Sequence, residues 1–383
     1  MKFKMKTTSV TISETAAGGS TTVMKATVLT GHGGIDKLEF RTDYPAPAPQ
    51  QDEVLITVGA CGLNNTDINT RTGWYDRVVE TNLSEDLGLK GRDDDAGLSW
   101  TGASIPFPRV QGAAVVGRIT AVGPGVDSAR IGERVIVDPS IRDESLPARA
   151  QMSGYLGSER DGGYAELVAV PAVNAHPIQS DLTDAELATF PCSYDTAEEM
   201  LERAGLSEGE TVVITGAAGG VGTALIQLAR IRGARVVAVA SGSKEERLRA
   251  LGAHDFVARE SQDLQAEVER LIGERGAHVA ADVVGGDMFG VLMKVLKPAG
   301  RYTTAGAIGG PITRIDLREL IYKDLEMHGI TNPTASTFAR LVGLIQSGQL
   351  KPLLEATYKL QDLPEAQTLM IKRSHVGKIV VTP

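Results

Sequence analysis

The glycine cluster at positions 216–222 constrains the fold of this chain more than any other feature. An apolar run, Thr211–Thr215, leads into glycines at 216, 219, 220 and 222, and a second apolar strand follows at Arg235–Ala240. Between them lies a helical pattern with three apolar residues on one face: Val221, Leu225 and Leu228. Strand, glycine turn, helix and strand form the unit that binds a dinucleotide, because glycine lets the backbone approach the pyrophosphate and the helix N-terminus offers free N–H groups. A tight turn without a ligand is the alternative.

The residues after the second strand indicate which dinucleotide binds. An NAD site places an acidic residue about 20 residues after the glycine turn, on the ribose hydroxyls. Here the strand is followed by Ser241, Ser243 and Lys244, and the first carboxylate is Glu245. Hydroxyls and a cation bind a 2′-phosphate by charge-assisted hydrogen bonds, whereas a carboxylate would repel it. We therefore expect NADP(H), although a helix N-cap at Ser243 and a solvated lysine would explain the same residues.

Composition excludes several classes of protein. The 383 residues are 42% hydrophobic, enough for two domains, and the net charge is -9 without a long basic run, so we expect no nucleic-acid partner. No apolar stretch approaches the ~20 residues of a membrane span, and the lysines near the N-terminus are followed by polar sequence rather than by a secretory core. Cys61 and Cys192 form neither a disulfide framework nor a zinc ribbon. We expect a soluble, cytoplasmic protein.

The pattern of apolar runs changes along the chain. Residues 1–23 resemble a polar extension, and residues 24–181 carry short β-branched runs between Gly/Pro turns, as in an antiparallel β barrel: Glu53–Val58, Ala113–Val122, Glu133–Val137 and Gly163–Val170. Residues 182–350 alternate strands with helices, as in a doubly wound α/β sheet: Val212–Thr215, Val236–Ala240, Asp255–Val257, Val279–Val284, Tyr302–Ala305 and Leu325–Ile330. Residues 351–383 return to β character, at Ala356–Leu360 and Gly377–Val381, and should complete the first domain.

One segment, Tyr75–Ser104, breaks this pattern because it is long, polar and acidic. Such a segment is usually a lid, an interface or disordered, and a solvated, tolerated insertion without a function is the alternative. The sequence does not distinguish these roles.

Several motifs together resemble the medium-chain dehydrogenase/reductase superfamily, in its zinc-free branch of quinone-oxidoreductase-like proteins. The resemblance covers Met24 to Pro383. It is carried by the glycine turn and by Cys61–Asp67, Arg71–Gly73, Gly132–Val135, Asp161–Glu166 and His375–Val380. It implies a GroES-like β-barrel catalytic domain, 24–181 with 351–383, joined to a Rossmann NADP-binding domain, 182–350.

The chain lacks most of the zinc ligands that alcohol dehydrogenases of this superfamily carry. Asn64 stands where those proteins have a cysteine, and Arg109-Val110-Gln111 stands in place of Gly-His-Glu. Cys192 alone matches a ligand position, and one thiolate cannot hold a zinc ion that needs three protein ligands. We expect no metal site, with Cys192 a small buried apolar residue.

Without zinc, another group must polarise a substrate carbonyl, and the candidate catalytic residues are Asn64, Thr66 and Asp67. The Asn64 amide can donate to a developing oxyanion, which contributes about 3 kcal/mol in a dry site. The resemblance implies that the Thr66 hydroxyl begins a proton relay. Alternatively, Asn64 and Asp67 brace their loop through backbone hydrogen bonds. Arg71 either pairs with Asp67 or lies at the surface.

The resemblance also implies which residues contact the cofactor. They are Thr196 near the nicotinamide, Val283 and Gly285 near the adenosine ribose, Ala305, Gly306 and Ala307 at the carboxamide, and Lys378 in the closing motif; they add to the residues already expected from the turn itself, Ala217, Gly219, Gly220, Val221 and Gly222, and from the end of the second strand, Ser241, Ser243 and Lys244. Each of these could instead belong to the scaffold.

Together these features predict an NADPH-dependent oxidoreductase that transfers hydride to a conjugated enone or a quinone. Direct reduction of a carbonyl, as by a zinc-free alcohol dehydrogenase, is the alternative within the same class. A structural or interaction protein that binds NADPH without turnover is the alternative from another class. The resemblance further implies a homodimer or a tetramer, paired through the late strands Tyr302–Ala305 and Leu325–Ile330.

Overall fold

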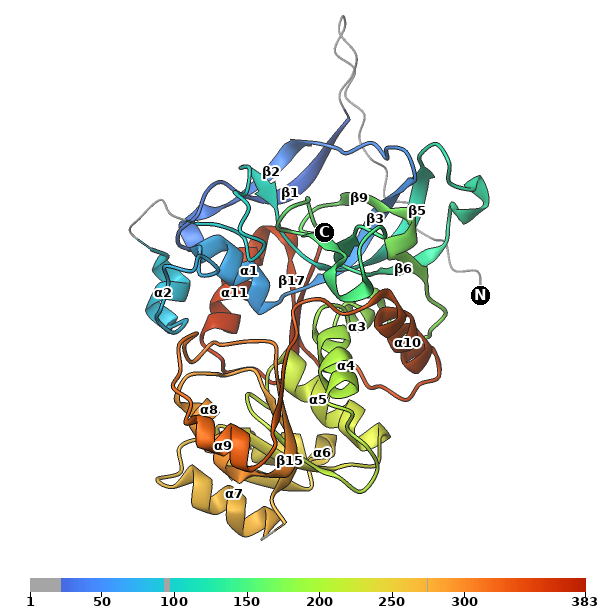
Figure 1. Cartoon of the computed structure of the whole chain (residues 1–383). Coiled ribbons are helices and arrows are strands. Elements are labelled where there is room, and N and C mark those ends of the chain that lie inside the picture. The colour runs from blue at the N-terminus through green and yellow to red at the C-terminus, as the bar shows by residue number, and fades with distance from the viewer. Residues whose placement is uncertain (1–21, 93–96, 274) are drawn as a thin grey trace, which may run out of the picture.

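The computed structural model of the chain describes residues 22–92, 97–273 and 275–383. Figure 1 shows two parts, a β-rich part that holds both ends of the described chain and an α/β part below it. Most of the expected polar extension, residues 1–23, lies outside the described residues, and the first strand, β1 (Val23–Leu29), already includes Val23.

The α/β part is built on a six-stranded parallel sheet with the order β13-β12-β11-β14-β15-β16. Its strands are β11 (Thr211–Ile214), β12 (Arg235–Ala240), β13 (Asp255–Ala258), β14 (Ala277–Asp282), β15 (Leu296–Thr304) and β16 (Glu326–Gly329). Chain order reverses beside β11, because β12 lies on one side of it and β14 on the other. The alternating strand–helix pattern therefore predicted this sheet correctly, and it provides the switch point at which such sheets bind ligands.

Helices cover both faces of this sheet because alternate strand residues point to opposite faces. Val212 and Ile214 belong to a core with α4 (Ser193–Arg203), α5 (Gly220–Ile231), α6 (Glu245–Leu251) and α10 (Ala335–Gln346). Val213 points the other way, into a core with α7 (Leu264–Ile272), α8 (Asp287–Val295) and α9 (Leu317–Tyr322).

The β-rich part contains a seven-stranded sheet in which β9 pairs with β3 beside the path β10-β6-β5-β3-β18-β17. The strands are β3 (Glu53–Gly62), β5 (Ala114–Val122), β6 (Arg134–Val137), β9 (Leu167–Pro171), β10 (Ala175–Pro177), β17 (Leu354–Lys359) and β18 (Lys378–Thr382). A three-stranded sheet joins β1 to β2 (Leu38–Pro45) and β4 (Arg109–Val110), and a hairpin joins β7 (Ser140–Arg142) to β8 (Met152–Tyr155). The short helix α3 (Asp184–Leu187) packs on β3 and β5.

One expected strand is shorter than the sequence indicates. The apolar run Gly163–Val170 was expected to form a single strand, but β9 begins only at Leu167. The preceding residues follow a different course: the Tyr164 N–H donates to Gln111 O, and its carbonyl accepts from Thr27 N–H. The run was misread because both halves are apolar and buried, although they pair with different strands.

The acidic insertion Tyr75–Ser104 contains a short helix, α2 (Glu85–Lys90), held by the long-range contacts of Arg71. Arg71 lies in α1 (Asn65–Thr72) and is fully buried. Its guanidinium donates to Gly88 O of α2, to Gly33 O and to Gln367 Oε1 of α11 (Leu363–Ile371), at 2.7, 2.8 and 2.9 Å. Both expected roles of Arg71 are therefore wrong: it neither lies at the surface nor hydrogen-bonds Asp67, but joins three segments.

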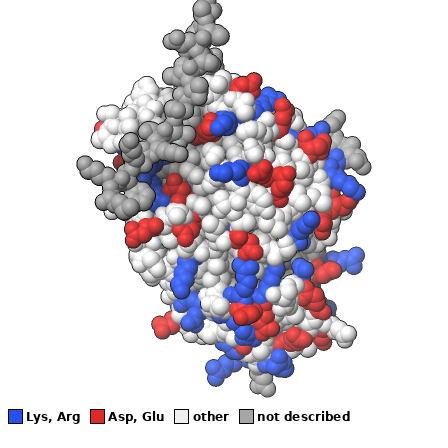
Figure 2. Space-filling model, turned by 180° about the vertical axis from the view of Figure 1, so that it is seen from behind, with Lys and Arg blue, Asp and Glu red and all other residues white. Residues whose placement is uncertain are grey.

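The surface carries mixed charge. Figure 2 shows Lys and Arg side chains interspersed with Asp and Glu over the described atoms of the reverse face. No helix among the described residues combines the length and apolarity that crossing a membrane requires.

Candidate functional site

The glycine turn has the geometry of a pyrophosphate-binding turn. Gly216 has φ 58°, a left-handed conformation that favours glycine. A Cβ on Gly222 would lie 2.3 Å from Gly216 O, so only glycine lets α5 start this close to the turn. At the α5 N-cap, a Cβ on Gly219 would have only Gly216 O within 4 Å, at 3.6 Å, so this side of the turn is open. The turn therefore fits a phosphate group against the helix N-terminus.

The other predicted cofactor residues lie at the carboxyl ends of adjacent strands. Asp282, the last residue of β14, accepts hydrogen bonds from Val284 N–H at 2.8 Å and Gly285 N–H at 3.1 Å, which fixes the loop containing Val283 and Gly285. A Cβ on Gly306 would lie 3.1 Å from Val283 O, so the loop with Ala305 and Ala307 packs directly against it. These loops lie beside the glycine turn because β11, β14 and β15 are neighbours.

Lys244, after β12, lies in a cluster of basic side chains. Its ammonium donates to Arg373 O at 2.7 Å and His375 O at 2.8 Å. Burial and the nearby Arg259 and Arg247 lower the Lys244 pKa, and burial and Arg259 also lower the Arg373 pKa. Arg259 and Arg373 were not predicted, because neither lies in the segment that directly follows β12.

Lys378 connects the glycine turn to the candidate catalytic loop. It is 3% exposed and donates to Leu63 O at 2.5 Å, to Ser193 Oγ at 3.1 Å and to Asn64 Oδ1. A Cβ on Gly220 would lie 2.8 Å from Lys378 Cδ, so the lysine stem runs along the start of α5. Burial lowers the Lys378 pKa, while Cys192 and Asp67 act in the opposite direction. Lys378 was expected to lie near the cofactor, but its contact with Asn64 was not foreseen.

The contacts of Asn64 orient its amide. Its oxygen accepts from Lys378 and from Ser193 Oγ at 3.2 Å, so the nitrogen points the other way and donates to Gly62 O at 3.1 Å. An amide nitrogen carries two hydrogens. Within the described part of the chain only one acceptor is found for it, Gly62 O. The second N–H is the group that could donate to a substrate oxygen.

Asp67 acts as a brace in this structure. Its carboxylate accepts from Asn64 N–H at 2.8 Å and from the Tyr164 hydroxyl at 2.7 Å. Burial raises its pKa to about 6, against the hydrogen bonds from Tyr164 and Asn64 that lower it. These contacts correspond to the loop-bracing alternative for Asp67.

Two aromatic residues that the sequence could not place lie in this region, Tyr75 near Thr66 and Tyr155 near Cys192. Burial raises the Tyr75 pKa to about 12, while the Thr66 and Asn69 side chains act in the opposite direction. Tyr155 interacts with the Cys192 thiol, and its ring meets the Trp100 ring edge-on at 6.4 Å between centroids. The described end of the insertion thus reaches this region through Trp100.

The positions that match zinc ligands have other roles here. Cys192 is only partly buried, so the expectation of a buried apolar residue is wrong in this respect, although removal from solvent raises the pKa of its thiol to about 12. Arg109 pairs with Asp161 at 2.7 Å, Val110 is buried in β4, and Gln111 donates to Asp67 O at 2.8 Å. Among the described residues, no group of three or more His, Cys, Asp or Glu side chains could hold a metal ion. Thr196, expected near the nicotinamide, donates from Oγ1 to Cys192 O at 2.5 Å in the first turn of α4.

Two family models match the sequence. Residues 50–180 match the alcohol dehydrogenase GroES-like domain, and residues 220–347 match the zinc-binding dehydrogenase model. Together with the sheets described above, these matches confirm the expected fold class, a GroES-like β domain with a Rossmann-like α/β domain.

Known proteins resemble the chain over nearly its full length. A crystal structure assigned as an alcohol dehydrogenase of Sinorhizobium meliloti 1021 is 48% identical, with a TM-score of 0.86, over 94% of this chain and 97% of that one. An NAD-dependent alcohol dehydrogenase of Sulfurisphaera tokodaii is 29% identical, over 94% of this chain and all of the relative. The quinone oxidoreductase of Rattus norvegicus is 26% identical, over 94% of this chain and 98% of the relative.

Proposed function

The chain belongs to the medium-chain dehydrogenase/reductase superfamily of oxidoreductases, and on that premise we propose that it is an NADPH-dependent reductase of conjugated enones or quinones that works without zinc. When bound, the dinucleotide supplies the hydride at nicotinamide C4. The protein positions both partners and stabilises the substrate oxygen on which negative charge develops.

The observation that carries this proposal is the arrangement of Lys378 and Asn64. The Lys378 ammonium donates to the Asn64 amide oxygen, which leaves an amide N–H for a substrate oxygen. A hydrogen bond at the oxygen polarises an amide and strengthens its N–H as a donor. A buried cation acting through an amide would thus replace the Lewis acid that zinc relatives use. The pairing of Arg109 with Asp161 favours the same reading.

The preference for NADPH is supported by the basic cluster after β12. Lys244, Arg259 and Arg373 lie close enough to perturb one another, in the region where Ser241 and Ser243 follow the strand. These groups suit a 2′-phosphate, which carries more negative charge than a hydroxyl. The name of the Sulfurisphaera relative gives NAD as its cofactor, so the preference needs a direct measurement.

Direct reduction of a carbonyl to an alcohol is the second candidate reaction. It is favoured by the two relatives named as alcohol dehydrogenases. The same Asn64 N–H would serve it, because both reactions place negative charge on an oxygen.

A turnover assay tests the proposed reaction. Consumption of NADPH and of NADH is followed with enones, quinones, aldehydes and ketones, against a blank without protein, and products are identified as saturated carbonyls, hydroquinones or alcohols.

A binding titration tests the proposed cofactor preference. The affinities of wild type and Lys244→Ala are measured for both dinucleotides. We expect NADPH to bind more than tenfold more tightly, since a charged phosphate contact is worth roughly 1.5–3 kcal/mol. Equal affinities in the wild type, or no turnover with any substrate class, would refute the corresponding part.

We also propose that the protein is a homodimer, or a tetramer built from such dimers, in the cytoplasm. β16 is the last strand of the parallel sheet, and next to it α9 exposes apolar side chains. Leu317, Ile321 and Tyr322 are 58%, 61% and 77% exposed, and Met327 on β16 is 45% exposed. A second copy pairing along this edge would cover both the unpaired strand and the apolar side chains.

A further inference from the structure

Glu260 brings a carboxylate to the place where the end of β12 lacks one. β12 and β13 are parallel, with Ala240 opposite Ala258, and the Arg259 N–H donates to Ala240 O at 2.8 Å. Gly242 and Glu260, which lie two positions beyond the ends of β12 and β13, are therefore neighbours. Glu260 Oε2 accepts the Gly242 N–H at 3.1 Å.

This position is where a dinucleotide fold recognises the adenosine ribose. Gly242 follows the last glycine of the turn, Gly222, by the roughly 20 residues at which NAD-binding proteins carry their ribose-binding acid. Here the acid comes from the neighbouring strand. We infer that Glu260 is a specificity-determining residue that weakens the preference for NADP(H), because its carboxylate accepts hydrogen bonds from a ribose hydroxyl and repels a 2′-phosphate.

The contacts of Glu260 keep it charged and in place. Burial opposes ionisation, but hydrogen bonds from Arg259, Ser241 and the Gly242 N–H hold the Glu260 pKa at about 2. Arg259 Nε lies 3.0 Å from Glu260 Oε1. The same contacts engage Arg259, one of the groups proposed to bind the phosphate, so Glu260 competes with the phosphate for this partner. The inference rests on the proposed dinucleotide binding. It concerns how Glu260 changes the ratio of the affinities for NADPH and NADH, and not which of the two binds more tightly in the wild type.

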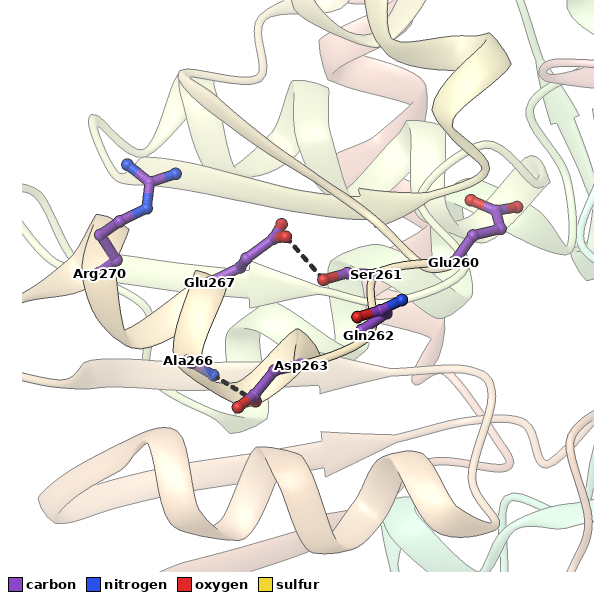
Figure 3. A pocket seen from close by; sticks show the side chains of 7 residues that line it. All are labelled: Glu260, Ser261, Gln262, Asp263, Ala266, Glu267 and Arg270. Carbon is purple, nitrogen blue, oxygen red and sulfur yellow. Dashed lines mark hydrogen bonds between the residues drawn. The ribbon is translucent and has the colours of Figure 1, made fainter.

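A matched control lies on the same surface. Figure 3 shows Glu260 at one end of the hollow before α7, while Glu267 points to Ser261 instead of β12. Glu267 Oε1 accepts from the Ser261 hydroxyl at 2.6 Å. Glu267→Gln therefore removes one negative charge from the same surface as Glu260→Gln does, but it removes no contact to the segment that follows β12.

The test measures dissociation constants of NADPH and NADH by fluorescence titration for wild type, Glu260→Gln and Glu267→Gln. Glutamine keeps the shape and one acceptor, so the fold should be retained, and thermal melts without ligand check this. We expect the ratio Kd(NADH)/Kd(NADPH) to rise roughly tenfold in Glu260→Gln, since one unit charge acts on a dianionic phosphate at short range. The rise should shrink in 0.5 M salt, because both groups are exposed to solvent.

The outcomes separate the two proposals. A ratio unchanged in Glu260→Gln, or raised equally in Glu267→Gln, would overturn the role of Glu260 while leaving the proposed function standing. A wild type that prefers NADH would contradict the proposed preference, and a rise in the ratio of Glu260→Gln would still support this inference. A wild type that binds neither dinucleotide would refute both.

Discussion

The Lys378 ammonium lies against the Asn64 amide oxygen, although 314 positions separate the two residues in sequence. Lys378 begins β18, and Asn64 precedes α1. The contact orients the amide so that its nitrogen, rather than its oxygen, is left for a substrate.

Asn64→Ala should lower turnover by about 10²–10³ while the NADPH dissociation constant changes little, because the donor acts mainly as charge develops on the substrate. Asn64→Asp should be at least as damaging, since a carboxylate would repel the forming oxyanion. Steady-state kinetics and NADPH titration measure both effects.

The effect of Thr66→Val on turnover is compared with that of Asn64→Ala. We expect a smaller loss of turnover in Thr66→Val, because water can also deliver the proton that the Thr66 hydroxyl would relay. Thermal melts of Asn64→Ala distinguish a catalytic role of Asn64 from a bracing role, because losing a brace lowers the melting temperature and losing a catalytic donor lowers only the turnover of the folded protein. A well-folded Asn64→Ala with unaltered turnover would remove Asn64 from the mechanism and direct attention to Tyr75 and Tyr155.

Chelation should leave the activity unchanged. Asn64 and Gln111 are engaged by protein groups, and Cys192 alone is one ligand where zinc needs three, so these positions offer no set of zinc ligands. Elemental analysis of the purified protein should find far less than one zinc per chain. About one zinc per chain, with activity lost on chelation and restored by the metal, would contradict the proposed mechanism.

Arg71→Met should destabilise the protein by about 3 kcal/mol, because it leaves the buried Gly33 and Gly88 carbonyls without their donor. Urea unfolding measures the loss. Arg118→Met is the control, since Arg118 is exposed on β5 and should change stability by less than about 0.5 kcal/mol. Equal effects of the two substitutions would show that the buried contacts of Arg71 contribute little.

Asp195→Asn should stabilise the protein increasingly as pH rises from about 4.5 to 8. Burial, with the nearby Asp138, raises the Asp195 pKa to about 7, while Arg142 and two backbone N–H groups act against this. The folded state therefore holds a proton that the unfolded state has already lost above pH 4, which costs on the order of 4 kcal/mol by pH 8.

Thermal melts of wild type and Asp195→Asn across this pH range test the prediction, with the exposed Glu144→Gln as a control. A difference between Asp195→Asn and wild type that is constant with pH would show that Asp195 ionises normally in the folded protein.

Ile321→Asp should convert the proposed dimer into a monomer of about 40 kDa, because a charge would be buried in the apolar edge formed by α9 and β16. Light scattering at micromolar concentration measures the mass. Val173→Asp, at a residue 75% exposed in the β-rich part, should leave it unchanged. A wild type that is already monomeric would refute the proposal.

The parallel sheet could be predicted from the sequence because its central strands β11, β12 and β14 are short, mostly apolar runs between helical patterns, whereas the start of β15 at Leu296 could not, because its first half, LKPAG, is not apolar. The run Gly163–Val170 was wrongly predicted to be one strand, because hydrophobicity does not reveal which strand a residue pairs with. The glycine turn was identified because its spacing is local. By contrast, Glu260, Arg373 and the Lys378–Asn64 contact depend on segments brought together only by the fold. The approach of Glu260 to Gly242 follows from the parallel register of β12 and β13, once that pairing is known.

The position of β18 between β3 and β17 has a consequence for when the protein can become active. Ribosomal synthesis completes all six strands of the parallel sheet before it reaches Lys378. A nascent chain can therefore form the glycine turn while the neighbouring reaction centre still lacks its only described contact between a lysine and Asn64. Competence for the proposed hydride transfer would then arise only after β18 has been synthesised, later than the capacity to bind a dinucleotide.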